Sequence, residues 1–186
     1  SDVYKRQLFD LKDTEENYFV VLLEELRVSG FKGVNITFPF KEKVIKHVDI
    51  ISENSRNVGS ANTLIFRKKI TAQNTDYTGF LKTYNFHFGK NTPGTILVLG
   101  AGGVSRAISF GLASLGAKKI FLIDKDEIKA NSLSKDLSIL NISCVVTKPD
   151  QIEKNLSSFD GIINCTPVGH YDFPGNPLGN LMPNKK

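Results

Sequence analysis

The stretch TILVLGAGGVSRA, residues 95–107, decides the fold of this 186-residue chain. Its first half is a short, unbroken apolar run, which is typical of a strand buried on both faces of a parallel sheet. Its second half places glycines at the end of that strand, and a small-residue helix is expected over residues 104–115. A strand that leads through a glycine-rich turn into a helix predicts a dinucleotide-binding unit.

The alternation of strand and helix continues towards the C-terminus. Further strands are predicted at KKIFLID (118–124), SCVVT (143–147) and GIINCT (161–166), and helices over 127–140 and 152–156. Strict alternation predicts a parallel, doubly wound sheet with right-handed crossovers. We therefore expect a Rossmann-like dinucleotide-binding domain over residues 90–186.

The first half of the chain is expected to form a smaller α/β domain, over residues 1–89, that binds the substrate. Apolar residues recur at helical spacing between residues 13 and 29, where Asp13 or Thr14 is the expected cap and Gly30 the expected stop. The other predicted elements are strands over 33–38, 60–66 and 70–74 and helices over 44–48 and 79–88. The cluster GKNTPG, residues 89–94, is the expected domain boundary.

The glycine turn is suited to a dinucleotide pyrophosphate. Gly100 permits a tight turn out of the strand, and Gly102 lets backbone amides approach an anion at the positive end of the next helix. Ser105 stands where the standard fingerprint has its third glycine, and Ala107 still allows close helix packing. The predicted cofactor loop comprises Gly100, Ala101, Gly102, Gly103, Val104 and Ser105. A purely structural turn is the alternative, and methyltransferases and flavoproteins carry similar turns.

An acidic residue ends the next predicted strand, in FLIDKDE, residues 121–127. Asp124 is placed to accept hydrogen bonds from the adenosine ribose and to repel a 2′-phosphate, which favours NAD over NADP. Lys125 and Lys129 would neutralise a 2′-phosphate if Asp124 turned away. The alternative is that Asp124 only caps the following helix.

Two segments before the glycine turn carry acid/base chemistry: GVNITFPFKEK, residues 33–43, and QNTDYTGF, residues 73–80. Lys41 would lose hydration in a partly closed cleft, which suits an amine for proton transfer, and Asp76 would hold it in place. Asn35, Thr37 and Asn62 are compact donors and acceptors for the hydroxyls of a sugar-like or cyclitol substrate. The alternatives are a solvated lysine at a helix start and an aspartate that serves as a turn or N-cap residue.

The composition favours a globular protein that binds small molecules. The hydrophobic fraction is 40% and the charged fraction 23%, both ordinary values. The net charge of +5 is dispersed, so a basic surface for anionic small molecules is favoured over nucleic-acid binding. No apolar run approaches the length of about 18 residues that suggests a membrane span. We expect a monomer or a homodimer.

Cysteine usage favours a reducing compartment. Cys144 and Cys165 lie in apolar, strand-like contexts and are expected to be reduced core residues of a cytoplasmic protein. His47, His87 and His170 form no ligand spacing with them, so no metal is expected. The start, SDVYKRQ, lacks the apolar core of a signal peptide. Both ends of the chain look cut, so a fragment of a longer protein is expected.

Five motifs, in order, cover most of residues 30–170. N-V-T-x-P-x-K is matched by Asn35 to Lys41, G-A-x-N-T by Gly59 to Thr63 with one variation, N-T-D-x-x-G by Asn74 to Gly79, G-x-G-G-x-x-x-A by Gly100 to Ala107, and N-x-T-P-x-G-M by Asn164 to His170, where histidine replaces methionine. With these motifs the chain resembles the shikimate dehydrogenases and their quinate/shikimate dehydrogenase relatives.

The resemblance implies NAD(P)-dependent, reversible reduction of 3-dehydroshikimate to shikimate in aromatic amino-acid biosynthesis. It implies that Lys41 and Asp76 are the catalytic pair and that Thr37 and Asn62 contact substrate hydroxyls. It also implies a nicotinamide-side loop of Thr166, Pro167, Val168 and Gly169.

The chain departs from the family pattern in three places. The N-terminal serine pair that grips the substrate carboxylate is absent, as are the C-terminal helices with their substrate-binding glutamine. Asp124, Lys125 and Asp126 replace the Asn-Arg-Thr or Asn-Arg-Ser of many NADP-using members, which favours NAD and the quinate/shikimate branch.

Three alternatives stay open. Quinate oxidation is compatible with the same motifs, since quinate differs by an added hydroxyl group. A non-catalytic cofactor- or metabolite-sensing protein on the same scaffold would not need the intact pair of Lys41 and Asp76. An S-adenosylmethionine methyltransferase would leave the lysine–carboxylate domain without a role.

Overall fold

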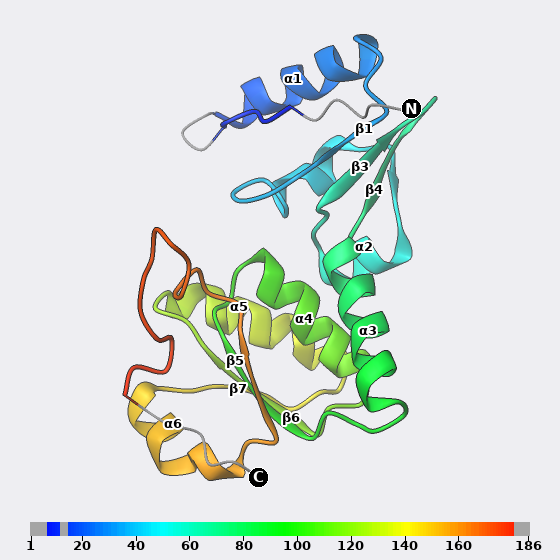
Figure 1. Ribbon diagram of the computed structural model, residues 1–186. Coiled ribbons are helices and arrows are strands. Elements are labelled where there is room, and N and C mark those ends of the chain that lie inside the picture. Colours follow the sequence, from blue (N-terminus) through cyan, green and yellow to red (C-terminus); the bar gives the residue numbers. More distant parts are fainter. Residues whose placement is uncertain (1–6, 12–14, 181–186) are drawn as a thin grey trace.

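The computed structural model describes residues 7–11 and 15–180, which form two lobes, each built on its own sheet. Figure 1 shows the two lobes one above the other, with helix α3 running from the first towards the second. The second lobe consists of β5 (Thr95–Leu99), α4 (Gly103–Ser114), β6 (Lys119–Ile123), α5 (Glu127–Ser138), β7 (Cys144–Val146), α6 (Pro149–Asn155), η2 (Leu156–Ser158) and β8 (Gly161–Asn164).

The sheet of the second lobe is parallel throughout, with strand order β7-β6-β5-β8. Val98 of β5 lies in register with Leu122 of β6 on one side and with Ile163 of β8 on the other. The first strand of the lobe is therefore central, and the chain reverses direction across the sheet between β5 and β8. This topology confirms the Rossmann-like prediction and creates a switch point, where such sheets bind ligands.

Apolar side chains of β5 alternate between the two faces of this sheet. Ile96 and Val98 pack in one buried cluster with α4 and α5, while Leu97 and Leu99 pack in another with Ile152 of α6. Figure 1 accordingly shows α4 and α5 on one face and α6 on the other. Each such fully buried aliphatic side chain stabilises the fold by about 1.5–3 kcal/mol.

The first lobe contains a mixed sheet of order β1-β3-β4-β2. Strands β1 and β4 are antiparallel to β3, and β2 is parallel to β4. Its elements are α1 (Glu16–Val28), β1 (Gly33–Asn35), η1 (Lys43–His47), β2 (Ile50–Ile51), α2 (Glu53–Val58), β3 (Thr63–Phe66), β4 (Ile70–Gln73) and α3 (Thr75–Phe88). The α/β character expected for this half of the chain is confirmed.

Helix α1 covers the first sheet with the apolar stripe that its sequence predicts. Phe19, Leu23 and Leu26 are buried, and the Phe19 ring stacks on that of Phe40 at 4.3 Å between centroids. The helix ends at Val28, and Gly30 adopts a φ of 85°. The expected caps, Asp13 and Thr14, lie outside the described residues.

Three element boundaries expected in the first lobe are wrong, and two short elements were not expected. The strand predicted over 60–66 begins only at Thr63. The strand predicted over 33–38 ends at Asn35, because a turn from the Thr37 carbonyl to the Phe40 amide follows at Pro39. The helix predicted over 79–88 already begins at Thr75, because the Asn74 side chain caps it. Helix α2 and the two-residue strand β2 were not predicted. Ser52 caps α2 and Gly59 ends it at a φ of 72°, but six residues are too few to show an apolar period.

Both cysteines are free, and both are partly buried side chains packed against the main core cluster of the second lobe, at its margin rather than at its centre. Burial raises the pKa of the Cys165 thiol to about 12 and also raises that of Cys144. Both thiols are therefore protonated near neutral pH, and neither is suited to act as a nucleophile. Within the described ranges, none of the helices has the length and apolar character needed to cross a membrane.

Candidate active site

Lys41 and Asp76 meet between the lobes although 35 residues separate them in sequence. The Lys41 ammonium donates a hydrogen bond to Asp76 Oδ2 at 2.7 Å. The two side chains are 14% and 29% exposed, so Lys41 is not a solvated surface lysine, and its amine is in direct contact with the Asp76 carboxylate. An ammonium held on a carboxylate in a partly buried site is suited to exchange a proton with a bound hydroxyl group.

The backbone around Lys41 is fixed from two sides. Phe40, the residue before Lys41, is 4% exposed and is packed in the core of the first lobe. The Ala61 amide donates to the Lys41 carbonyl at 2.8 Å. The lysine thus extends from a segment whose direction is set by core packing and by the turn that follows α2.

Asp76 lies in the first turn of α3, where a carboxylate interacts favourably with the helix dipole. It is not the cap of that helix, since Asn74 accepts the Tyr77 amide at 3.1 Å. Asn74 is 2% exposed and donates from Nδ2 to the carbonyl and the hydroxyl of Ser60, both at 3.1 Å. This buried amide fixes the helix start and, with it, the position of Asp76.

The polar residues predicted to contact the substrate lie at the ends of the strands of the first lobe. Asn35 Nδ2 donates to Thr63 Oγ1 at 3.3 Å, and the Thr37 side chain is exposed. Asn62 Oδ1 accepts from the amide and the hydroxyl of Thr75 at 2.9 and 3.0 Å. Asn62 therefore also ties this edge to α3, one residue before Asp76.

The glycine loop joins β5 to α4 with the geometry expected of a phosphate-binding turn. Gly100 has a φ of 99°, and a Cβ atom there would lie 3.1 Å from the Cys165 carbonyl oxygen, so glycine is required. At Gly102 a Cβ atom would meet nothing within 4 Å, so the loop faces open space. Ser105 is fully buried, so its hydroxyl group is not exposed to the open side of the loop.

Asp124 is not the cap of α5, because that role belongs to Asp126, whose Oδ1 accepts from the amides of Ile128 and Lys129. Asp124 Oδ2 accepts the Ala101 amide at 2.6 Å, and Oδ1 accepts the Asp126 amide at 2.8 Å. The half-buried carboxylate thus connects the glycine loop to the end of β6, the place from which a ribose would be bound.

The two lysines beside Asp124 are both exposed, at positions 125 and 129. Lys129 lies 3.5 Å from Asp126 Oδ2 and is directed to that carboxylate.

The loop after β8 lies beside the glycine loop, as the switch point requires. Asn164 Oδ1 accepts from the amide and the hydroxyl of Thr166 at 2.9 and 2.6 Å, and its Nδ2 donates to the Val168 carbonyl at 2.9 Å. A hollow of about 600 Å³ is lined by this loop, namely Asn164, Thr166, Pro167, Val168, Gly169, His170, Asp172 and Phe173. A larger hollow, of about 750 Å³, is lined by residues between 8 and 22 and contains none of the predicted site residues.

Lys41 lies directly against the first residue of α4. A Cβ atom on Gly103 would lie 3.3 Å from Lys41 Cδ and 3.4 Å from Lys41 Cβ. The predicted acid/base residue and the predicted pyrophosphate loop are therefore neighbours, and the glycine at this position lets the lysine stem approach the helix.

Sequence reasoning missed the residues that hold these parts together, among them Asn74 and Arg106. Both lie inside motifs that were noticed, N-T-D-x-x-G and the glycine loop. The available signal for Asn74 was its position before a helix, where Asn is a preferred N-cap. Arg106 gave no such signal, because its partners come from distant segments.

Taken together, two α/β lobes and a glycine loop at the switch point of a parallel sheet define a two-lobed protein of the dinucleotide-binding class. Residues 4–64 match the model of the shikimate dehydrogenase substrate binding domain. The NADP(+) shikimate dehydrogenase of Pseudarthrobacter chlorophenolicus is 34% identical over 164 residues, which cover 84% of this chain and 55% of that protein.

Two further relatives carry quinate in their names. The quinate/shikimate dehydrogenase (NAD(+)) of Corynebacterium efficiens is 31% identical over 158 residues, 83% of this chain and 56% of the relative. The quinate dehydrogenase of Corynebacterium glutamicum, solved in complex with NAD, superposes with a TM-score of 0.76 at 29% identity, over 85% of this chain and 57% of that one. The chain belongs to the shikimate dehydrogenase family and spans somewhat more than half the length of these relatives.

Proposed function

We propose that this chain carries the acid/base pair and the dinucleotide site of a shikimate dehydrogenase, which interconverts 3-dehydroshikimate and shikimate with a nicotinamide cofactor. The observation that carries the proposal is the ion pair of Lys41 and Asp76, at 2.7 Å, seated against Gly103 at the start of α4. Residues 1–89 would supply the substrate side and residues 90–186 the cofactor side. The two free thiols favour a reducing compartment, and we place the enzyme in the cytoplasm.

The residues of the second lobe fit a dinucleotide. The positive φ of Gly100, the open space at Gly102 and the amides at the start of α4 together suit a pyrophosphate. Asp124 lies where an adenosine ribose would be bound, and residues 166–169 line the hollow on the nicotinamide side. When bound, the nicotinamide supplies or accepts the hydride.

Within this proposal, Lys41 holds the mobile proton. In ketone reduction its ammonium donates a hydrogen bond to the carbonyl oxygen, stabilises the charge that develops there and transfers a proton to it. In alcohol oxidation the neutral amine accepts the hydroxyl proton. Asp76 fixes the direction of the amine, since Lys41 Nζ lies 2.7 Å from its Oδ2.

The polar edge of the first lobe would hold the remaining substrate hydroxyls. The exposed Thr37 hydroxyl lies four residues before the catalytic lysine, on the same segment. Asn62 uses Oδ1 on Thr75, which leaves its Nδ2 as a donor to a substrate hydroxyl. Asn35, bonded to Thr63, is a further candidate at the same edge.

Quinate oxidation is the second candidate. It is supported by relatives that bear quinate in their names, one of them solved with NAD. The carboxylate at Asp124 agrees with the NAD dependence of that branch. A sensor without catalysis is disfavoured by the intact ion pair of Lys41 and Asp76.

The preference for NAD should depend on the charge of Asp124. We expect Asp124→Asn, which keeps an acceptor for the Ala101 amide, to lower the ratio of kcat/KM for NAD to that for NADP. The expected change is about 5- to 10-fold, because one like charge near a phosphate at the surface is worth about 1 kcal/mol. Asp124→Ala should change the ratio similarly and also loosen the loop. A cofactor ratio unchanged in both variants would mean that Asp124 serves only to bind the amides of Ala101 and Asp126.

The contact between Gly103 and Lys41 predicts a separation of stability from activity. Gly103→Ala should lower kcat by about 3- to 10-fold, since displacing the lysine stem by a few tenths of an ångström misaligns its amine. Thermal stability should be retained, because alanine favours the helix more than glycine does. Unchanged turnover in Gly103→Ala would mean that the stem moves without consequence for the amine.

The proposal is tested by initial rates of nicotinamide reduction with shikimate and with quinate, each under NAD and under NADP. The rates should be measured on this chain and on a version extended to the length of its relatives. Shikimate turnover in the extended protein is the expected result. Quinate turnover alone would establish the second candidate. Cofactor binding without turnover of either compound would favour the sensor.

A further inference from the structure

Arg106 joins three helices at the junction of the lobes. Its Nε donates to the Val58 carbonyl at 2.9 Å, at the end of α2, and its Nη1 donates to Asp136 Oδ2 of α5 at 2.8 Å. The side chain is 13% exposed, and its guanidinium carbon lies 5.8 Å from the centre of the Phe110 ring. A guanidinium that donates two charge-assisted hydrogen bonds at a largely buried junction holds its partners more firmly than a solvent-exposed salt bridge does.

The glycine after Val58 permits this close approach. A Cβ atom on Gly59 would lie 3.1 Å from Arg106 Nη2, and Gly59 adopts a φ of 72°. The end of α2 therefore combines a left-handed residue with an arginine packed over it. Because this turn has its own glycine cap, the arginine is not needed to end the helix. Its bond instead ties the turn to the second lobe.

The turn held by Arg106 is the segment that supports both members of the acid/base pair. Ser60 accepts two hydrogen bonds from Asn74, which caps the helix of Asp76. The Ala61 amide donates to the Lys41 carbonyl. The four residues 58–61 thus link α4, which carries Arg106, to both Lys41 and Asp76.

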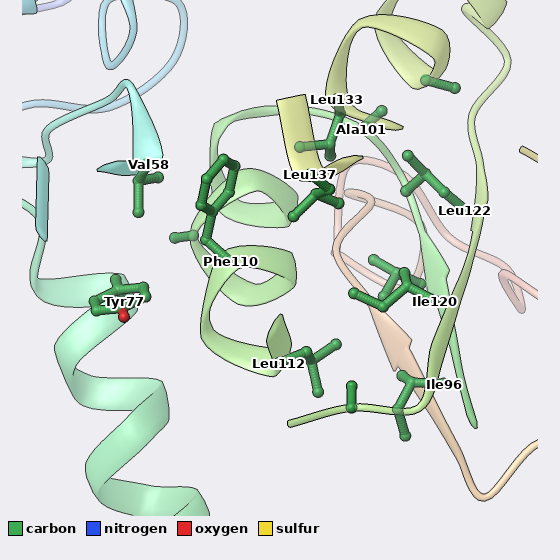
Figure 2. Close-up of a cluster of buried hydrophobic side chains, with 14 residues drawn as sticks. Val58, Tyr77, Ile96, Ala101, Phe110, Leu112, Ile120, Leu122, Leu133 and Leu137 are labelled. Carbon is green, nitrogen blue, oxygen red and sulfur yellow. The ribbon is translucent and has the colours of Figure 1, made fainter. Parts of the chain in front are cut away.

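The same junction between the lobes also contains apolar contacts, which are less directional than hydrogen bonds. Figure 2 shows Val58 and Tyr77 facing Phe110 of α4 within one apolar cluster. The Tyr77 hydroxyl is also 2.8 Å from Ser114 Oγ, at the far end of α4. Apolar contacts tolerate sliding, whereas two directed bonds cross this junction: Tyr77 to Ser114, and Arg106 to the Val58 carbonyl. Only the arginine bond reaches the turn after α2, and the bond to Asp136, within the second lobe, holds the guanidinium in place for it.

We infer that Arg106 is a positioning residue, which sets the acid/base pair relative to the glycine loop through the turn of residues 58–61. This inference rests on the proposed dehydrogenase function for its kinetic consequence. Its structural consequence, a fixed relation between the lobes, does not depend on which reaction is catalysed.

The kinetic test compares Arg106→Gln and Asp136→Asn with Arg56→Gln, which removes an exposed arginine from α2. We expect Arg106→Gln to lower kcat by about 10- to 100-fold, the effect of misplacing reacting groups by up to about 1 Å, with cofactor affinity changed less than about 3-fold. The deuterium isotope effect on kcat should increase, because the chemical step becomes slower. Asp136→Asn should change both quantities in the same direction by less, and Arg56→Gln neither. A role in folding alone would lower the active fraction and leave the isotope effect unchanged, which would overturn the inference.

The structural test measures the distance between spin labels on exposed positions of the two lobes, Lys68→Cys and Lys118→Cys, with Cys144 and Cys165 replaced by alanine. We expect a single narrow distribution with the native arginine and a broader or shifted one in Arg106→Gln and Asp136→Asn. Identical distributions in all variants would overturn the inference. Because this readout needs no turnover, a protein that fails to oxidise shikimate but shows the broadened distribution refutes the proposed function and keeps the positioning role.

Discussion

Lys41→Ala is expected to lower kcat for shikimate oxidation by about 10²–10⁴-fold, the usual contribution of a positioned general acid or base. KM for shikimate and cofactor affinity should change little, because the amine acts on a proton that moves only in the transition state. The structural basis is the position of Lys41 Nζ, 2.7 Å from Asp76 Oδ2 and on a side chain that is 14% exposed. The measurement is steady-state kinetics with both cofactors, together with direct titration of cofactor binding.

Lys43→Ala is the matched control for that variant. Lys43 lies two residues further along the same segment, is 46% exposed and lies 3.7 Å from Glu16 of α1. Its removal takes away the same charge from the same surface, so turnover should be nearly normal. A large increase in KM with normal kcat in Lys41→Ala would make Lys41 a binding residue and would contradict the assigned role.

Asp76→Ala is expected to lower kcat by about 10²-fold, since a lysine without its partner samples many directions and a misplacement of about 1 Å has that effect. Asp76→Asn should be less severe, because the amide oxygen still accepts from Lys41. The fold should survive both changes, as Asn74 rather than Asp76 caps α3. The measurement is kcat and KM for each variant beside thermal unfolding.

The double variant decides whether the two residues act as one unit. If Asp76 works by orienting Lys41, then Lys41→Ala with Asp76→Ala should be no slower than Lys41→Ala alone, since residues that act as a unit are strongly non-additive. Effects that multiply would show two independent roles, for example a direct hydrogen bond from the substrate to Asp76.

Most of the second lobe was predictable from sequence because its elements carry strong local signals. The apolar run before Gly100 is long enough to identify β5, and strict alternation with helices identifies the parallel sheet. The strand order followed less directly, since only the doubly wound pattern was expected. Helix ends agreed to within three residues, apart from α3, whose cap at Asn74 was read as part of a strand.

The first lobe was less predictable because its elements are short. Helix α2 has six residues and β2 has two, so neither shows a periodic pattern. Both depend on contacts made after folding, such as the pairing of Ile51 with Ala72. The extent of β1 was also misjudged, because Pro39 was taken to end a strand that in fact ends at Asn35.

The candidate site likewise contains residues that the sequence identified and residues that it did not. The types and order of Lys41, Asp76 and the glycines were informative, because their chemistry depends on residue type. Of the residues that support them, Asn74 offered only its preference for a helix N-cap and Arg106 offered no signal, since both act through partners on separate elements. Asp124 was placed correctly at the end of β6, but its bond to the Ala101 amide follows only from the three-dimensional turn. The roles of these residues in catalysis and binding stay predictions.

The most direct test follows a deuterium atom. The protein, extended to the length of its relatives, is incubated with oxidised cofactor and with shikimate deuterated at the carbinol carbon that becomes the ketone of 3-dehydroshikimate. The mass of the reduced cofactor is then determined. If the protein is a dehydrogenase in which Lys41 and Asp76 carry out acid/base catalysis, each reduced cofactor should contain one deuterium. The Lys41→Ala variant should form this labelled cofactor far more slowly. Bound cofactor that stays oxidised, or reduced cofactor that carries no label, would contradict the account.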